Sequence, residues 1–159
     1  MEIKTGYLYH IKDEYFDVAN DDSLMQNHEK GKKRPTYFTI KDKDILWFIP
    51  ISSKIDKYQR IIDKKIERYG VCNTIIIRKI ADNDAAILLQ NAFPILEKYI
   101  SHVHTMKDGK PLKVIDSLKE EITNDFKYMM SLKKSGINLF FTDIDRIKEI
   151  MLEEEKITI

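Results

Sequence analysis

The sequence holds few of the residues that mark several classes of protein. Only one of its 159 residues is cysteine, Cys72, which excludes a disulfide framework and a paired-cysteine zinc or redox motif. Five glycines and four prolines are too few for a collagen-like or low-complexity chain. No run of about 18 apolar residues occurs, so we expect no membrane-spanning helix. The first residues include an early acid and lack the apolar stretch of a secretory signal, so we expect a cytoplasmic protein.

The composition that remains is typical of a folded chain. Hydrophobic residues make up 43% and charged residues 33%, close to average usage, which excludes wholesale disorder. A chain of this length buries most of its unfolded surface around one core. We therefore expect a single domain over residues 1–159.

The small net charge of +1 hides a segregation along the chain. Counting Lys and Arg against Asp and Glu gives −4 for residues 1–27, +8 for residues 28–80 and −3 for residues 81–159. The middle third is therefore a basic segment between two acidic ones. A local excess of positive charge attracts a polyanion such as RNA. The alternative is that these cations pair with the acidic flanks in the folded protein.

Hydrophobic periodicity predicts an α+β fold. Strands are predicted over residues 5–11, 36–41, 45–51, 74–80, 85–91, 95–106 and 111–115. Helices are predicted over residues 12–22, 54–69 and 116–134, followed by a last helix capped by Thr142 or Asp143. Residues 23–35 are predicted to form a loop. Short strands mixed with three to four helices imply a compact curved antiparallel sheet or a small SH3-like barrel.

The junction of a predicted strand and helix at Ser52, Ser53 and Lys54 is the most informative place in the sequence. The start of a helix presents unpaired N–H groups and partial positive charge, which bind phosphate. Capping explains the serines, because Ser53 followed by Asp56 resembles a capping box. It does not explain Lys54 and Lys57, because cations in the first turn oppose the helix dipole. The lysines therefore indicate an anion-binding site.

The predicted helix continues with further cations off its apolar stripe. Lys57, Lys64 and Arg68 recur at helical spacing and form a row that can follow a nucleic-acid backbone. Arg60 and Lys65 also lie off the apolar stripe. Single-stranded RNA sites also use aromatic platforms beside cations. The candidates for such platforms are Tyr7, Tyr9 and Tyr37.

RNA cleavage is one reaction that such a site can support, since RNA carries its own nucleophile, the 2′-hydroxyl. An enzyme must align this hydroxyl with the phosphorus, stabilise charge on the phosphate oxygens and help two protons move. Serine hydroxyls, backbone amides and one lysine suffice for the phosphate, so no metal or other cofactor is obligatory. His102 and His104 lack a clear third ligand and do not indicate a zinc site. The acceptor of the first proton stays open among His10, His28, Tyr7, Tyr9 and a lysine of lowered pKa.

Residues 33–61, KRPTYFTIKDKDILWFIPISSKIDKYQRI, resemble the ToxN/AbiQ toxins of type III toxin–antitoxin systems, most closely the CptN-like branch. In those proteins a basic residue and a proline precede a paired strand, and an apolar strand ending in proline leads to Ser or Thr, Ser and Lys at the head of a basic helix. The matching residues here are Arg34-Pro35, Phe48-Ile49-Pro50 and Ser52-Ser53-Lys54.

The resemblance implies a metal-independent endoribonuclease on a fold related to MazF and Kid. Such toxins cut single-stranded RNA to leave a 2′,3′-cyclic phosphate and a 5′-hydroxyl, and act in abortive infection against phage. Their antitoxin is an RNA pseudoknot, cut from a tandem-repeat precursor, that occludes the active groove in a multimeric toxin–RNA assembly. By the matching motif, Ser53 and Lys54 would be catalytic with Ser52 beside them. The residues expected to contact RNA are Tyr7, Tyr9, Lys32, Lys33, Arg34, Lys57, Arg60, Lys64 and Arg68.

One departure from the family pattern concerns the position of the lysine. Many members have a proline between the serine and the lysine, whereas Lys54 follows Ser53 directly, so Lys57 is an alternative candidate. Tyr7 is likewise an alternative to Tyr9, because both lie on one face of the same predicted strand. Two other functions remain open: an RNA-binding module without catalysis, and a related toxin neutralised by a protein.

Overall fold

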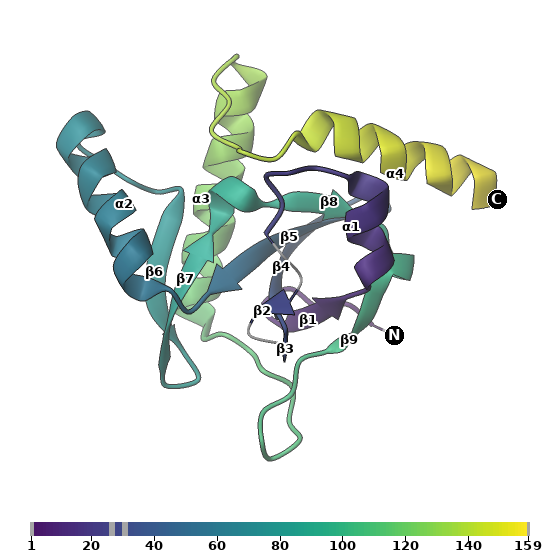
Figure 1. The fold of residues 1–159 in the computed structure, drawn as a ribbon, viewed down its shortest axis with the longest axis horizontal. Helices are drawn as coiled ribbons and strands as arrows, with labels where there is room; N and C mark the ends of the chain where they lie inside the picture. The colour runs from purple at the N-terminus through teal and green to yellow at the C-terminus, as the bar shows by residue number, and fades with distance from the viewer. Residues whose placement is uncertain (1, 26–27, 30–31, 159) are drawn as a thin grey trace.

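The structure of the chain, a computed structural model, describes residues 2–25, 28–29 and 32–158 (Figure 1). Its strands are β1 (Leu8–Ile11), β2 (His28–Glu29), β3 (Lys32–Lys33), β4 (Thr36–Asp42), β5 (Ile45–Ser52), β6 (Ile75–Ile80), β7 (Asn83–Leu88), β8 (Phe93–Ile95) and β9 (Ile100–Val103). Its helices are α1 (Asp13–Ala19), α2 (Ile55–Tyr69), α3 (Asp116–Lys134) and α4 (Ile144–Thr158), with short 3₁₀ turns η1 (Leu89–Asn91) and η2 (Glu97–Tyr99).

Strand β5 lies at the centre of an antiparallel sheet of seven strands. The order is β6-β7-β5-β4-β1-β9, and β8 pairs with the first half of β5. Strand β7 pairs only with the end of β5, through Ile51 and Ser52. Among the described strands, the edge strands β6 and β9 do not pair with each other, so the curved sheet is not a closed barrel. The predicted α+β class with a curved antiparallel sheet is confirmed.

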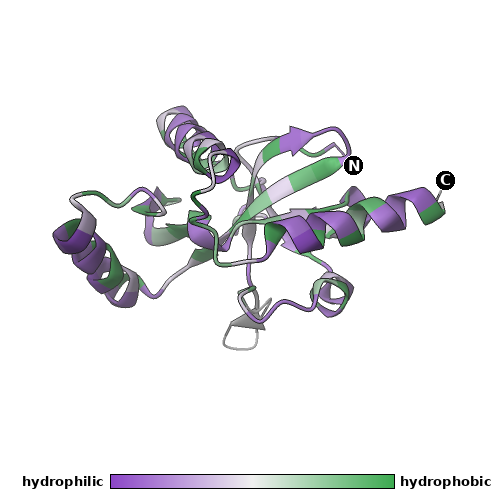
Figure 2. Ribbon diagram, turned by 90° about the horizontal axis from the view of Figure 1, so that it is seen from above, coloured by the Kyte–Doolittle hydropathy of each residue, from purple (hydrophilic) through white to green (hydrophobic). Residues whose placement is uncertain are grey.

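Helices pack on the sheet through aromatic and aliphatic side chains. Phe126 of α3 lies 5.7 Å from the ring of Trp47 on β5. Tyr15 of α1 packs against Phe93 of β8, and its hydroxyl donates a hydrogen bond to a buried carbonyl. Helix α2 packs on β6 and β7 through a small separate cluster that includes Tyr58. In Figure 2 most of the ribbon of α2 has the colours of hydrophilic residues, with hydrophobic positions in between.

The sequence prediction is wrong in four segments. The strand expected over residues 95–106 is broken by η2, because Tyr99 turns inward to pack on Tyr15. The strand expected over residues 85–91 ends at Leu88, after which η1 begins. Residues 111–115 form two isolated bridges, and residues 23–35 contain the paired strands β2 and β3. The other predicted strands and all four helices are confirmed within a few residues, with Asp143 accepting a cap hydrogen bond from the N–H of Arg146.

No helix of the described chain has the length and apolar character needed to cross a membrane.

Candidate nucleic-acid interface

The β5–α2 junction is a tight turn held by its own backbone. The N–H of Ile55 donates to the carbonyl of Ser53 at 2.9 Å, and Lys54 between them has φ −80° and ψ 66°. This is an inverse γ-turn, a common way for a strand to end. The N–H of Lys54 donates to Oγ of Ser52 at 3.2 Å, and the carbonyl of Lys54 accepts from the N–H of Tyr58.

The capping box predicted for Ser53 and Asp56 is wrong. The residue at the cap position is Lys54, and its side chain makes no capping hydrogen bond. Ser53 is exposed, and within the described ranges its hydroxyl contacts no hydrogen-bond partner. The N–H groups of Asp56 and Lys57 in the first turn also lack a partner there. An exposed hydroxyl, two N–H groups and two lysines therefore converge on the start of α2.

Ser52 and Arg34 lie beneath this turn. Ser52 is 1% exposed, and its side chain serves the turn through the bond to Lys54. Arg34 is also buried, and its Nη1 donates to the carbonyl of Ile51 at 3.0 Å. Both side chains therefore fix the path of the backbone just before the exposed Ser53.

The cations of α2 are available to a ligand. Lys57, Arg60, Lys64 and Arg68 are exposed, and none makes a salt bridge with any residue that the structure describes. The acidic flanks pair elsewhere: Asp21 with Arg146, and Glu154 with Lys98. The alternative interpretation, that the acidic segments neutralise the basic one, therefore fails for this helix.

The structure brings Tyr9 nearer to the junction than Tyr7. Tyr9 on β1 lies opposite Thr36 on β4, and Thr36 lies opposite Pro50 on β5. Tyr9 is therefore two strand spacings, about 10 Å, from Pro50. Directly opposed residues share a face of the sheet, and Ser52 lies on that face as well. Tyr9 is buried, and its hydroxyl accepts a hydrogen bond from the N–H of Lys4 at 2.8 Å. Its ring therefore supports the sheet and is not open for stacking, whereas Tyr7 is half-buried.

Two predicted contacts lie in the short hairpin before β4. Lys32 and Lys33 form β3, which pairs with His28 and Glu29 of β2. The side chains of these four residues lie outside what the structure describes. Their backbone positions place this hairpin directly before Arg34 in the chain.

Three histidines that the sequence did not group together meet where β1 pairs with β9: His10 on β1, His102 on β9 and His104 just after β9. Nε2 of His10 lies 2.8 Å from Nδ1 of His104, and the rings of His10 and His102 stack at 4.7 Å. Burial, and secondarily the nearby His102, lower the pKa of His104. The side chain of His10 leaves β1 on the face opposite to that of Tyr9. The only sequence signal was the alternation of His102 and His104 on one strand, and His10 is 92 residues from His102.

His10 and His104 hydrogen-bond to each other, whereas Nδ1 of His102 lies 2.8 Å from the hydroxyl of Ser101. Among the described residues, no group of three or more His, Cys, Asp or Glu side chains is placed to hold a metal ion.

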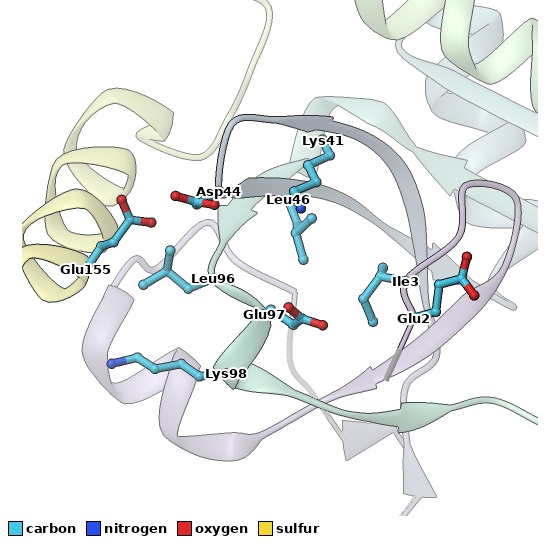
Figure 3. A pocket seen from close by; sticks show the side chains of 9 residues that line it. All are labelled: Glu2, Ile3, Lys41, Asp44, Leu46, Leu96, Glu97, Lys98 and Glu155. Carbon is cyan, nitrogen blue, oxygen red and sulfur yellow. The ribbon is translucent and has the colours of Figure 1, made fainter. Parts of the chain in front are cut away.

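A cavity on the opposite side of the molecule from α2 has the wrong charge for RNA. It measures about 460 Å³ and is lined by four carboxylates and two lysines (Figure 3). Glu155 of α4 and Asp44 of the β4–β5 turn lie side by side there, and burial together with Asp44 raises the pKa of Glu155. Glu154 accepts a hydrogen bond from the Tyr99 hydroxyl. The acidic end of the chain therefore faces away from the basic helix.

Comparisons with known proteins identify the fold. No protein-family pattern matches the sequence, and no curated protein matches it. Among solved structures, the chain is similar to AbiQ, a lactococcal anti-phage endoribonuclease belonging to the type III toxin–antitoxin system. The TM-score is 0.72 at 16% sequence identity, and the match covers 96% of this chain and 99% of AbiQ. The resemblance seen in residues 33–61 therefore extends over the whole fold, and this chain has the fold of AbiQ.

Proposed function

We propose that this protein is a cytoplasmic endoribonuclease toxin of a type III toxin–antitoxin system. The observation that carries the proposal is the exposed Ser53-Lys54 pair at the head of a helix whose four exposed cations make no salt bridge with a described residue. The fold shared with AbiQ, itself an endoribonuclease, supports the same function.

In this proposal, the reaction is a transesterification within single-stranded RNA. The 2′-oxygen forms a bond to the phosphorus, and the bond from the phosphorus to the 5′-oxygen breaks. The proton lost by the 2′-hydroxyl is balanced by the one that the 5′-oxygen gains. The products are a 2′,3′-cyclic phosphate and a 5′-hydroxyl, and neither water nor a metal ion enters the balance.

The residues of the junction divide into catalytic and positioning groups. The ammonium of Lys54 stabilises the negative charge that develops on the phosphate oxygens. The hydroxyl of Ser53 and the N–H groups at the start of α2 donate hydrogen bonds to the same oxygens. Ser52 and Arg34 position the turn through their bonds to Lys54 and Ile51.

The remaining predicted residues would bind RNA on either side of the cut. The exposed cations of α2 contact phosphates, and Tyr7 and the β2–β3 hairpin extend the interface across β1 and β4. Tyr9 contributes by supporting the end of the sheet, since its ring is buried. The proposed contacts on this surface are Tyr7, Lys32, Lys33, Lys57, Arg60, Lys64 and Arg68.

The test is cleavage of RNA by the purified protein in the presence of EDTA. We expect discrete fragments whose 3′ ends resist a phosphatase that acts only on monoesters and become sensitive after acid opens the cyclic phosphate. Tight RNA binding without cleavage would make the protein an RNA-binding module instead. Cleavage that stops in EDTA, or 3′ ends that carry a free hydroxyl, would contradict the mechanism.

The proposed partner is a structured RNA that occupies the same surface. A repeat-encoded pseudoknot antitoxin would be cut by the toxin and would then fill its basic face in a multimeric assembly. The DNA upstream of the gene tests this directly: short tandem repeats followed by a terminator support an RNA antitoxin. A small overlapping reading frame would indicate a protein antitoxin.

A further inference from the structure

A second cavity lies at the far end of α2 from the Ser53-Lys54 junction. It measures about 530 Å³, within the range of about 300–1,000 Å³ that is common for small-ligand sites. Its walls are the last turns of α2 and α3 and the segments that follow them. Apart from Lys65, which belongs to the basic helix, neither the predicted site nor the proposed mechanism uses these residues.

Three aromatic side chains line this cavity and keep much of their surface open. Tyr69 is 66% exposed, Tyr128 is 51% exposed and Phe141 is 57% exposed. Packing in the core accounts for a buried aromatic ring, but it does not account for three half-exposed rings around one cavity. Such rings provide faces on which a planar ligand can stack.

The polar groups of the cavity suit the edge of a planar heterocycle. Nζ of Lys65 donates to Oγ1 of Thr74 at 2.9 Å and to Oε1 of Gln90 at 2.8 Å, and it lies 5.6 Å from the centre of the Phe141 ring. Two of the three N–H donors of this ammonium are used within the protein, and no described hydrogen-bond acceptor takes the third. The amides of Asn73 and Asn138 also line the cavity. Together these groups offer donors and acceptors beside the stacking surface.

The charge around the cavity favours nucleic acid over other planar ligands. Lys65 is the only charged side chain among the described residues that line it. The exposed row of Lys57, Lys64 and Arg68 leads along α2 from the junction to the cavity, a distance of about 22 Å for 15 residues. Arg68 also lies 5.3 Å from the ring of Tyr69. Cations along a path that ends in aromatic rings are the combination that binds single strands.

We propose that this cavity binds a base of single-stranded RNA, several nucleotides away from the phosphate that is cut. The inference rests on the proposed function and extends it, because it adds an anchoring site that acts on affinity and not on the chemical step. The base stacks on Tyr128 and Phe141, and its edge meets Lys65 and the asparagine amides.

The test is a binding measurement with a fluorescein-labelled single-stranded RNA of about 15 nucleotides in EDTA. A Lys54→Ala background slows cleavage enough for binding to be measured on intact RNA. We expect Tyr128→Ala and Phe141→Ala each to raise Kd by about 5- to 100-fold, the range for loss of one stacked base. The salt dependence of Kd should stay unchanged, because no phosphate contact is lost. Thermal melting should stay near that of the parent, since both side chains are more than half exposed.

Two variants serve as matched controls. Tyr128→Phe keeps the ring and should bind within about twofold of the parent. Ile115→Ala removes another exposed apolar side chain, 68% exposed, at the opposite end of α3, and should have no effect. RNA carrying 5-iodouridine should crosslink under ultraviolet light to the peptides that contain Tyr69 or Tyr128.

Two failures are distinguishable. If the parent binds RNA but both alanine variants bind equally well, the cavity does not hold a base, and a role for it in docking a protein would also give this result. If the parent neither binds nor cuts RNA, the proposed function itself is wrong.

Discussion

At the scale of single residues, the adjacent serines Ser52 and Ser53 differ in whether the hydroxyl is exposed to a ligand. The hydroxyl of Ser52 is buried and already accepts the N–H of Lys54, so it holds the turn. The hydroxyl of Ser53 is exposed and has no such task among the described residues. The same turn sets the direction in which Lys54 leaves the backbone. In the proposed mechanism, the γ-turn and not the spacing from a proline therefore decides which lysine stands beside Ser53.

The first prediction concerns Lys54. Replacing it by alanine should lower the rate of RNA cleavage by about 10²–10³-fold, the usual loss for one group that stabilises a developing charge. The side chain is exposed, so the midpoint of urea unfolding should not change. Lys57→Ala is the matched control three residues further along the same turn and should reduce cleavage far less. The opposite ranking of the two variants would place the catalytic lysine at Lys57.

The hydrogen-bonded pair of His10 and His104 depends on protonation. If both imidazoles carried two protons, N–H groups would face each other across the 2.8 Å contact. Burial and His102 lower the pKa of His104 below its usual value. A lowered pKa means that the unfolded chain binds more protons than the folded chain as the solution becomes acidic. The resulting stability is present above the unfolded pKa, near 6.5, and is lost as the pH falls toward the folded pKa.

The second prediction follows from the lowered pKa of His104. The urea midpoint of the wild-type protein should fall between pH 7.5 and pH 5, and that of His104→Gln should fall less, because glutamine bonds without titrating. Carboxylates elsewhere contribute equally to both proteins, so the difference between the two slopes isolates the histidine. Identical slopes would show that the histidine pair does not titrate in this window.

At the scale of elements, α2 shows what periodicity predicts and what it misses. Its apolar stripe, its end at Gly70 and its basic row follow from the sequence, and Gly70 has the positive φ of 82° that favours glycine. The stripe is not uniformly buried, however: Tyr58 is buried while Ile66 and Tyr69 are exposed. Period alone does not reveal which residues of the stripe the sheet covers. No pattern within residues 54–69 therefore predicts the cavity at the far end of the helix.

The third prediction concerns the basic row of α2. Lys64→Ala removes one phosphate contact, so the slope of log Kd against log salt concentration should fall by about one unit while cleavage of saturating RNA stays unchanged. Lys156→Ala on α4 removes the same charge from the acidic side and should leave the slope as it is. Equal effects of the two variants would mean that RNA responds to net charge and not to the α2 surface.

At the scale of the whole molecule, the sequence predicts local structure better than the meeting of distant segments. The hairpin of β4 and β5 and the helices after it were found because their signals lie within a few neighbouring residues. The pairing of β7 and β8 with the two halves of β5 was not predicted. Contact between strands that are far apart in the sequence produces no periodic pattern in either strand. The histidine cluster and the aromatic cavity were missed for the same reason.

The folded chain converts segregation along the sequence into two opposite faces. The basic row lies on α2, while Glu154 and Glu155 of α4 lie beside Lys98 and the acidic cavity. Figure 1 shows α2 and α4 projecting from opposite ends of the molecule. A polyanion is therefore attracted to one side and repelled from the other.

The last prediction tests this polarity by hydrogen–deuterium exchange. Helix α2 is peripheral and contacts the body mainly through β6 and β7, so its amides should exchange fast enough to report a bound ligand. With saturating RNA on the Lys54→Ala protein, we expect protection of residues 52–72 and of the peptide that contains Tyr128. Peptides of α4 beyond Met151 should exchange at the same rate with and without RNA, because carboxylates dominate that surface. Protection spread equally over α2 and α4 would show that the charge segregation does not direct RNA, and would contradict both the proposed surface and the cavity at its end.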